Sequence, residues 1–202
     1  MRNKILITIF ACMALAGCMP HSASQPARFY GLYSPNVSQT RGPATTTNVA
    51  IDYASVPQSV DRPQIVIRQS GSTVLNVAEF DRWIEELNTA LPVIMSENMN
   101  AYARNIAARP GHGGIKRNAK YIVSVDFVRF ETESDGKITV SAWWTISDSR
   151  GDALVQKKNT FTAATPENIA SNRPDYDAIV DTYSKLIAKL SYKIADTLSE
   201  LK

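Results

Sequence analysis

Cys18 is the residue of this 202-residue chain best placed for covalent chemistry. A deprotonated cysteine thiol is a strong nucleophile, and this one directly follows the small residues Ala16 and Gly17. Small side chains before a cut suit a signal peptidase, and a thiol just after the cut can accept a diacylglycerol group. The spacing therefore makes Cys18 the candidate for lipid attachment.

The residues before Cys18 have the pattern of a secretory signal. Arg2 and Lys4 make the start positive, and the following run, 5–16, is almost entirely apolar. Such a run is shorter than the roughly 20 apolar residues of a transmembrane helix, but it suits a signal peptide. Leu15-Ala16-Gly17-Cys18 resembles the bacterial lipobox; the alternative is an ordinary signal with a chance cysteine. We expect a signal peptide over 1–17, a lipidated tether over 18–27 and a periplasmic domain over 28–202.

Met19 bears on the destination of the lipoprotein. In enterobacterial sorting an aspartate after the lipid cysteine retains a lipoprotein at the inner membrane, and this chain has methionine there. By that analogy we expect the periplasmic face of the outer membrane. Several acyl chains on one residue hold a protein far more firmly than one chain does. The covalent lipid on Cys18 is the only non-protein group that the sequence predicts.

Charge and cysteine content exclude several classes of protein. The formal net charge is +3, and removing the signal removes Arg2 and Lys4 but no acid, which leaves 3 − 2 = +1. A nearly neutral chain without a run of lysines and arginines has no nucleic-acid footprint. Cys12 leaves with the signal, so the mature chain holds one cysteine and forms no internal disulfide.

Other residues that could do chemistry do not assemble into a site. His21 and His112 are the only histidines, and His21 lies in the tether. The sequence therefore offers no set of ligands for a zinc ion. The stretch Gly111-His112-Gly113-Gly114 is glycine-rich, but it is not followed by the Gly-Lys-Ser/Thr of a phosphate-binding loop. It is interpreted as a flexible linker. A solvated surface is the interpretation for the acidic residues Asp126, Glu131, Glu133 and Asp135. We therefore predict no catalytic or metal site, and a protein that is not an enzyme.

Alternating apolar and polar residues predict strands on both sides of a helical segment. The second half shows the clearest case: an Asp-Gly turn at 135–136 joins two alternating segments, which is a strong hairpin signal. Trp143 lies on the otherwise polar side of its segment, so it is either an oligomer contact or covered by a loop. Strands are expected over 28–33, 48–53, 64–68, 73–76, 121–131, 137–147 and 153–163.

Two segments change to helical spacing. Apolar residues recur every three or four positions from Phe80, and the helix is expected to run to about Ala108, with Pro92 kinking or restarting it. A second long helix is expected after Pro174. The order of elements predicts a single α+β domain, with a mainly antiparallel sheet and two long amphipathic helices packed on one face.

One segment carries a family resemblance. Residues 56–68 read Val-Pro-Gln-Ser-Val-Asp-Arg-Pro-Gln-Ile-Val-Ile-Arg, an aromatic strand Phe29-Tyr30-Gly31-Leu32 precedes them, and Arg82-Trp83 follows. This pattern resembles the PqiC-type auxiliary lipoproteins of ABC and MCE lipid-transport systems, although Ser59-Val60 stands where that family usually has Tyr-Leu. The resemblance implies an outer-membrane lipoprotein beside an inner-membrane-anchored MCE protein that spans the periplasm, in a system that moves phospholipid and protects the envelope.

The same residues can also be interpreted without the family. Asp61 could cap a turn, or pair with Arg62, Arg68 or Arg82 in a cluster that fixes a strand to a helix; the arginines could instead contact a partner. Trp83 fits a core position better than a surface contact. The candidate contacts are Asp61, Arg62, Pro63, Gln64, Arg68, Arg82 and Trp83, with Trp143 as the candidate oligomer contact.

Three functions remain open from the sequence. The first is a non-catalytic subunit of an MCE-type lipid-transport machine, assembled as a homo-oligomer. The second is a lipoprotein that carries lipid itself, which requires a roomy apolar pocket. The third is an envelope assembly or activator lipoprotein for a peptidoglycan synthase or a secretin.

Overall fold

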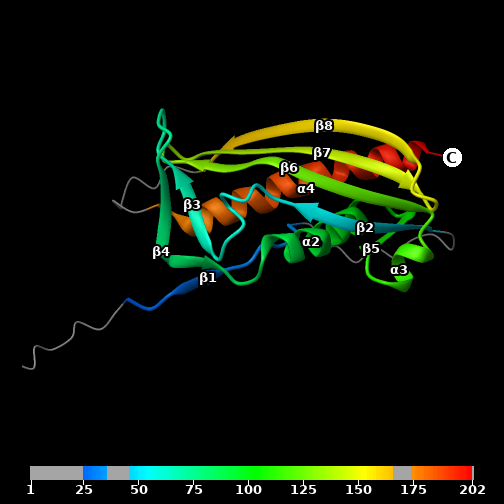
Figure 1. Ribbon diagram of the computed structural model, residues 1–202, viewed down its shortest axis with the longest axis horizontal. Coiled ribbons are helices and arrows are strands. Elements are labelled where there is room, and N and C mark those ends of the chain that lie inside the picture. The colour runs from blue at the N-terminus through cyan, green and yellow to red at the C-terminus, as the bar shows by residue number, and fades with distance from the viewer. Residues whose placement is uncertain (1–24, 36–45, 166–173, 202) are drawn as a thin grey trace, which may run out of the picture.

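A computed structural model of the chain describes residues 25–35, 46–165 and 174–201. The signal peptide, Cys18, His21 and most of the tether lie outside the described residues. The described parts form one α+β domain, in which an eight-stranded mixed sheet packs against two long helices (Figure 1). The fold class predicted from the sequence is thereby confirmed.

Three long strands form the antiparallel half of the sheet: β6 (Tyr121–Glu133), β7 (Lys137–Asp148) and β8 (Ala153–Ala164). Strand β7 pairs with β6 on one side and β8 on the other along most of its length. The predicted turn at 135–136 is present, and Gly136 adopts a positive φ of 83° that favours glycine. Alternate residues of β7 point into the core and are almost fully buried: Ile138, Val140, Ala142, Trp144 and Ile146.

The other edge of β6 is shared by two shorter groups of strands. Strand β2 (Thr47–Ser55) pairs in parallel with the start of β6 and with β5 (Ile106–Pro110). Strand β3 (Gln64–Arg68) meets the end of β6 at Thr132 and Glu133. It also forms an antiparallel hairpin with β4 (Leu75–Trp83), whose last residues pair in parallel with β1 (Arg28–Tyr30).

Helix α4 (Tyr176–Glu200) covers the inner face of the sheet beneath β7 and β8 (Figure 1). Its first turn is capped by Asp175, whose carboxylate accepts a hydrogen bond from Ala178 N at 3.0 Å. The apolar spacing predicted after Pro174 becomes its buried stripe, made of Ile179, Tyr183, Leu186, Ile187, Leu190, Ile194 and Leu198. None of the helices within the described residues is both long enough and apolar enough to span a membrane.

The first predicted helix is wrong at both ends. Helix α2 spans Leu87–Tyr102, and residues from Phe80 to Trp83 belong to β4. The apolar spacing from Phe80 to Leu87 fits a helix, but pairing with β1 and β3 takes the first part into the sheet. Pro92 lies inside α2 without restarting it. Proline has no backbone N–H, so the helix lacks the hydrogen bond from position 92 to the carbonyl of the exposed residue Asn88.

The segment after α2 is a strand because another part of the chain pairs with it. Strand β5 aligns in parallel with β2, and the Asn100 side chain bonds both backbone groups of Ala108, at 2.9 Å to the carbonyl and 2.7 Å from the amide. This amide side chain thus occupies the place of a neighbouring strand. The linker predicted at 111–114 leads into one short helical turn, α3 (Gly114–Arg117).

Candidate functional site: the open face of the sheet

The face of β6, β7 and β8 that points away from the helices, here called the open face, carries the polar half of each alternating strand. On β7 it presents Lys137, Thr139, Ser141, Trp143 and Thr145, between the core residues given above. Short hydroxyl side chains bond across it, Ser141 to Thr160 at 2.7 Å and Thr139 to Thr162 at 3.4 Å. Thr139 and Ser141 are themselves buried among their neighbours, so the more exposed side chains, Trp143 among them, form the outer surface of this face.

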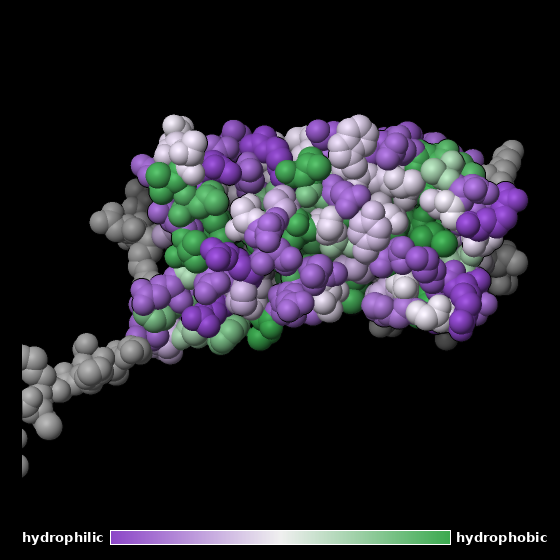
Figure 2. Space-filling model, in the orientation of Figure 1, coloured by the Kyte–Doolittle hydropathy of each residue, from purple (hydrophilic) through white to green (hydrophobic). Residues whose placement is uncertain are grey.

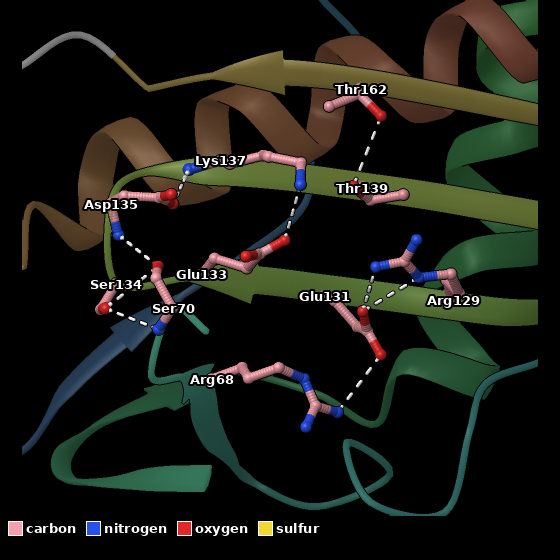
Figure 3. A network of polar contacts seen from close by, with 10 residues as sticks. All are labelled: Arg68, Ser70, Arg129, Glu131, Glu133, Ser134, Asp135, Lys137, Thr139 and Thr162. Carbon is pink, nitrogen blue, oxygen red and sulfur yellow. Dashed lines mark hydrogen bonds and ion pairs between the residues drawn. The ribbon is translucent and has the colours of Figure 1, made fainter. Parts of the chain in front are cut away.

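Charged pairs order one end of the open face (Figure 3). Glu131 lies between two guanidinium groups, with Arg129 Nη2 at 2.7 Å and Arg68 Nη2 at 3.4 Å. Burial by itself would raise the pKa of Glu131, but the hydrogen bonds and charges of Arg129 and Arg68 outweigh it, so the pKa is lowered. Glu133 pairs with Lys137 at 3.0 Å. Glu131 and Glu133 thus each lie beside a cationic side chain at this end of the open face.

A row of aligned residues that includes Trp143 crosses the middle of the open face. The register aligns Ser55, Asp126, Trp143 and Lys158 on four adjacent strands. Asp126 accepts hydrogen bonds from Tyr53 Oη at 3.1 Å and Ser55 Oγ at 2.6 Å, and Lys158 Nζ lies 5.6 Å from the centre of the Trp143 ring. Tyr53 and Trp143 are each 44% exposed. Since Trp143 stays this open, no loop of the described residues covers it.

Strand β8 gives the open face a free edge. Among the described residues β8 pairs with β7 alone. A twelve-residue strand with unpaired backbone groups is a template for another strand, and lysines are a common protection against indiscriminate pairing. Lys157 and Lys158 lie in the middle of this edge. The edge therefore permits selective association through the backbone.

The residues of the Asp-Arg-Pro-Gln motif form the turn that leads into β3. Asp61, Arg62 and Pro63 are exposed, and Gln64 starts the strand opposite Arg82. The backbone carbonyl of Pro63 accepts a hydrogen bond from Trp83 N at 2.7 Å, which fixes the bend of β4. Pro63 of the motif thus links the start of β3 to the end of β4.

The ion pairs predicted for Asp61 are not found. Within the described part of the chain, Asp61 forms no ion pair with Arg62, Arg68 or Arg82. Arg68 lies at the far end of β3, where β6 supplies Glu131 instead. Arg82 donates from Nη2 to the carbonyl of Glu79 at 3.5 Å, and its Nε is buried without a partner among the described residues.

Trp83 is buried, with 6% of its surface exposed, so it is part of the core and contacts no outside partner. Its ring meets Phe130 and Tyr183 edge-on, at centroid distances of 6.4 and 6.1 Å, and the latter two stack at 4.2 Å. Such aromatic contacts stabilise a core beyond simple area burial. Burial raises the pKa of Tyr183, whose hydroxyl is hydrogen-bonded to Thr132.

Sequence reasoning missed a buried carboxylate at the start of the domain. Asp81 is bonded by Arg28, with 2.7 Å between Nη2 and Oδ1, and by the hydroxyl of Tyr30 at 2.9 Å. Burial, and then the hydrogen bond to Asp81, raise the pKa of Tyr30 to about 12. The three residues meet because β1 and β4 align Arg28 with Asp81. No local pattern connects positions this far apart in the sequence.

Chemically, the open face is suited to binding. Its carboxylates are paired with cations or hydroxyls, and within residues 25–35, 46–165 and 174–201 no three metal-ligating side chains gather into a possible metal site. Tyrosine, tryptophan and arginine on one surface are the residue types that dominate protein–protein contacts.

Solved structures share this fold. An uncharacterized protein of known crystal structure matches with 16% identity over 86% of this chain and 99% of its own, at a TM-score of 0.68. A Xanthomonas campestris protein of the DUF330 family matches with 15% identity over 84% of this chain and 93% of its own, at a TM-score of 0.62. A dodecameric PelC from Paraburkholderia phytofirmans gives a TM-score of only 0.41, with 20% identity over 76% and 92% of the two chains.

A comparison with curated protein sequences found no match. The sequence does match a family described as the ABC-type transport auxiliary lipoprotein component, over residues 30–195. That range takes in every strand and helix from the end of β1 to most of α4. The chain therefore belongs to the family of ABC-type transport auxiliary lipoprotein components.

Proposed function

We propose that this protein is a non-catalytic outer-membrane lipoprotein subunit of an MCE-type system that moves phospholipid between membranes. It is anchored by lipid on Cys18 and docks an inner-membrane-anchored MCE partner that spans the periplasm. The family supports the coarser part of this proposal, an auxiliary lipoprotein of a transporter. The observation that carries the rest is the open face with its free edge at β8, which offers means of assembly.

The start of the domain supports attachment to a membrane. Phe29 and Ile84 are the most exposed large apolar side chains among the described residues, at 57% and 61%. They lie on paired segments, because Ile84 N donates to the carbonyl of Tyr30 at 2.9 Å and the Ile84 side chain rests over Gly31, two residues after Phe29. Only ten positions separate Cys18 from Arg28, a reach of at most about 35 Å. An acylated Cys18 would keep this apolar pair near the lipid.

The packed interior favours a subunit over a lipid carrier. A carrier needs an enclosed apolar cavity large enough for acyl chains. Between the sheet and α4 the space is filled by side chains that are at most 1% exposed, including Trp144, Phe130, Leu186 and Leu190. Interiors of this kind are close-packed. The proposal therefore assigns lipid movement to the assembled system and docking to this subunit.

Affinity capture of the intact lipoprotein from membranes tests the partner. We expect an MCE-domain protein to co-purify from the wild type, and much less of it from a Trp143→Glu variant with normal folding. Capture of a peptidoglycan synthase or a secretin in its place would contradict the proposal and favour an assembly or activator role.

The Cys18→Ser variant tests the anchor. Without the thiol no acyl group can be attached, so we expect the protein to leave the membrane fraction for the soluble periplasmic fraction. Fractionation and intact-mass measurement check this outcome. If the variant still sediments with membranes at unchanged mass, Cys18 is not the anchor.

A further inference from the structure

A cleft of about 530 Å³ lies where β2, β5 and α3 meet. Its apolar floor includes the buried residues Val49 and Ala119, and polar side chains surround it. An apolar floor within a polar rim suits an amphiphilic ligand or its headgroup. The polar side chains that line the cleft are Asn48, Arg109, His112 and Asn118.

The stretch of sequence that supplies most of the cleft lining has an excess of positive charge, and Arg109 is the cation that lines the cleft itself. From Asn98 to Val125 the sequence contains five lysines and arginines and His112, but no aspartate or glutamate. Lys116 pairs with Asp52 at 2.7 Å. The other four have no carboxylate partner among the described residues: Arg104, Arg109, Arg117 and Lys120. In a mature chain with a formal charge near zero, this clustering produces a local positive potential that attracts anions.

The wall of the cleft is held in place by a close backbone contact. Gly111 N donates to the carbonyl of Ile51 at 2.7 Å. A Cβ atom at Gly111 would lie 2.9 Å from that oxygen and from Asp52 Cα, so a larger residue cannot approach as closely. This contact fixes the loop that bears His112 against β2, with Arg109 in the adjoining strand. A rim fixed in this way loses little entropy when a ligand binds.

Helix α3, which borders the cleft, lies at the other end of the domain from β1 (Figure 1). Figure 2, in the same orientation, shows hydrophilic side chains at the end where Figure 1 places α3, as it does over much of this face. Since the expected anchor precedes β1, an anion in this cleft would be distant from the attachment point. It would come from a lipid in transit or from solution, and not from the lipids around the anchor.

We propose that this cleft binds the phosphate group of a phospholipid headgroup, with Arg109 and His112 as its principal contacts. Guanidinium groups form strong, charge-assisted hydrogen bonds to phosphate oxygens. The choice of a lipid, as opposed to free phosphate, rests on the proposed function. The charge and the geometry of the cleft do not depend on it.

Native mass spectrometry of the full-length acylated protein, released from a neutral maltoside, tests the site. The probes are short-chain phosphatidylglycerol, inorganic phosphate and an uncharged diacylglycerol with the same chains. Saturable binding of phosphatidylglycerol in preference to inorganic phosphate assigns the site to a headgroup, whereas equal binding assigns it to free phosphate. Saturation by the uncharged diacylglycerol alone would overturn the proposal.

A pair of charge-matched variants locates the binding. Arg109→Gln should weaken phosphate-dependent binding about tenfold, as expected for the loss of one charge-assisted contact. Arg62→Gln removes the same charge from an exposed arginine in the turn before β3, and should leave the affinity within about twofold if binding is local. Equal weakening by both variants would mean that the lipid is attracted non-specifically by the charge of the whole protein. Tighter binding of an acidic peptide than of phosphatidylglycerol would mean that the cleft binds a protein partner. Either result would overturn the proposed site. Affinity capture tests whether an MCE protein is the partner, whereas native mass spectrometry tests whether the cleft binds a ligand. Either proposal can therefore fail while the other stands.

Discussion

At the scale of single residues, an aromatic cluster within the core joins three elements. Trp83 from β4, Phe130 from β6 and Tyr183 from α4 contact one another pairwise. Because strand, sheet and helix meet in these three rings, loss of one ring leaves a cavity that the neighbours cannot readily fill.

Trp83→Ala should therefore lower the free energy of unfolding by about 3–5 kcal/mol. Denaturant melts of the acyl-free domain measure this loss. Trp143→Ala is the matched control, since that ring lies on the open face, and it should cost no more than about 1 kcal/mol. A cost below about 1 kcal/mol for Trp83→Ala would place its side chain outside the core.

Glu131 should make stability depend on pH. Its pKa in the folded protein is lowered by Arg129 and Arg68. A lowered carboxyl pKa means that the unfolded chain binds the proton more tightly. The contribution is therefore present above the unfolded value, near 4.5, and is lost as the pH falls through the folded pKa.

We expect this contribution to be on the order of 1 kcal/mol, since the pair is partly solvated. Glu131→Gln should flatten the fall in melting temperature between neutral and acidic pH, measured by circular dichroism. Glu97→Gln, a change at an exposed glutamate of α2, should leave the profile as it is in the wild type. Identical profiles for all three proteins would contradict the assignment.

At the scale of elements, β2 is held on both sides by partners distant in sequence. It pairs with β6 on one side and β5 on the other. The close approach of Gly111 extends the β5 side beyond its last paired residue, Pro110. At this end of the sheet, a side chain at position 111 would therefore require the backbone to shift.

Gly111→Ala should lower the free energy of unfolding by about 1–3 kcal/mol, because its Cβ would overlap the backbone of β2. Gly114→Ala is the control: its Cβ would meet only the end of the Arg117 side chain, at 3.9 Å. Hydrogen exchange should show faster exchange in β2 and β5 for the first variant alone. Equal stability of both variants would mean that the loop relaxes without cost.

At the scale of the whole molecule, the two faces of the sheet have different roles. The inner face is covered by the helices and filled with apolar side chains. The open face carries Trp143 and Tyr53 and ends at the free edge of β8. Identical subunits that associate head-to-tail around an axis close into a ring, a shape that suits a partner spanning the periplasm.

The acyl-free domain should accordingly self-associate, and Trp143→Glu should raise the dissociation constant by at least about tenfold, as for a central aromatic contact. Analytical ultracentrifugation measures the association, and a melt of the same variant should show little loss of stability. A strict monomer at high micromolar concentration, alone and with the MCE partner, would rule out the ring and leave a monomeric clamp.

The sequence by itself determined the features that depend on short-range pattern. The alternation in β6, β7 and β8, the Asp-Gly turn between β6 and β7, and the stripe of α4 are local periodicities, and the structure confirms all of them. The side of the strand on which Trp143 lies followed from the same alternation. The lipid cysteine is also a local pattern, and it stays a prediction.

Only the tertiary structure decided the features in which distant segments compete for the same residues. The segment from Phe80 to Trp83 has helical spacing, but β1 and β3 supply backbone partners that an isolated segment lacks. Residues after α2 become β5 because Asn100 and β2 complete their hydrogen bonds. The pairing of Arg68 with Glu131, the burial of Asp81 and the cationic cleft likewise depend on strand register. The register of two paired strands cannot be deduced from either strand alone. Backbone hydrogen bonds can form in any register, and the packing of side chains in the folded domain decides which register is adopted.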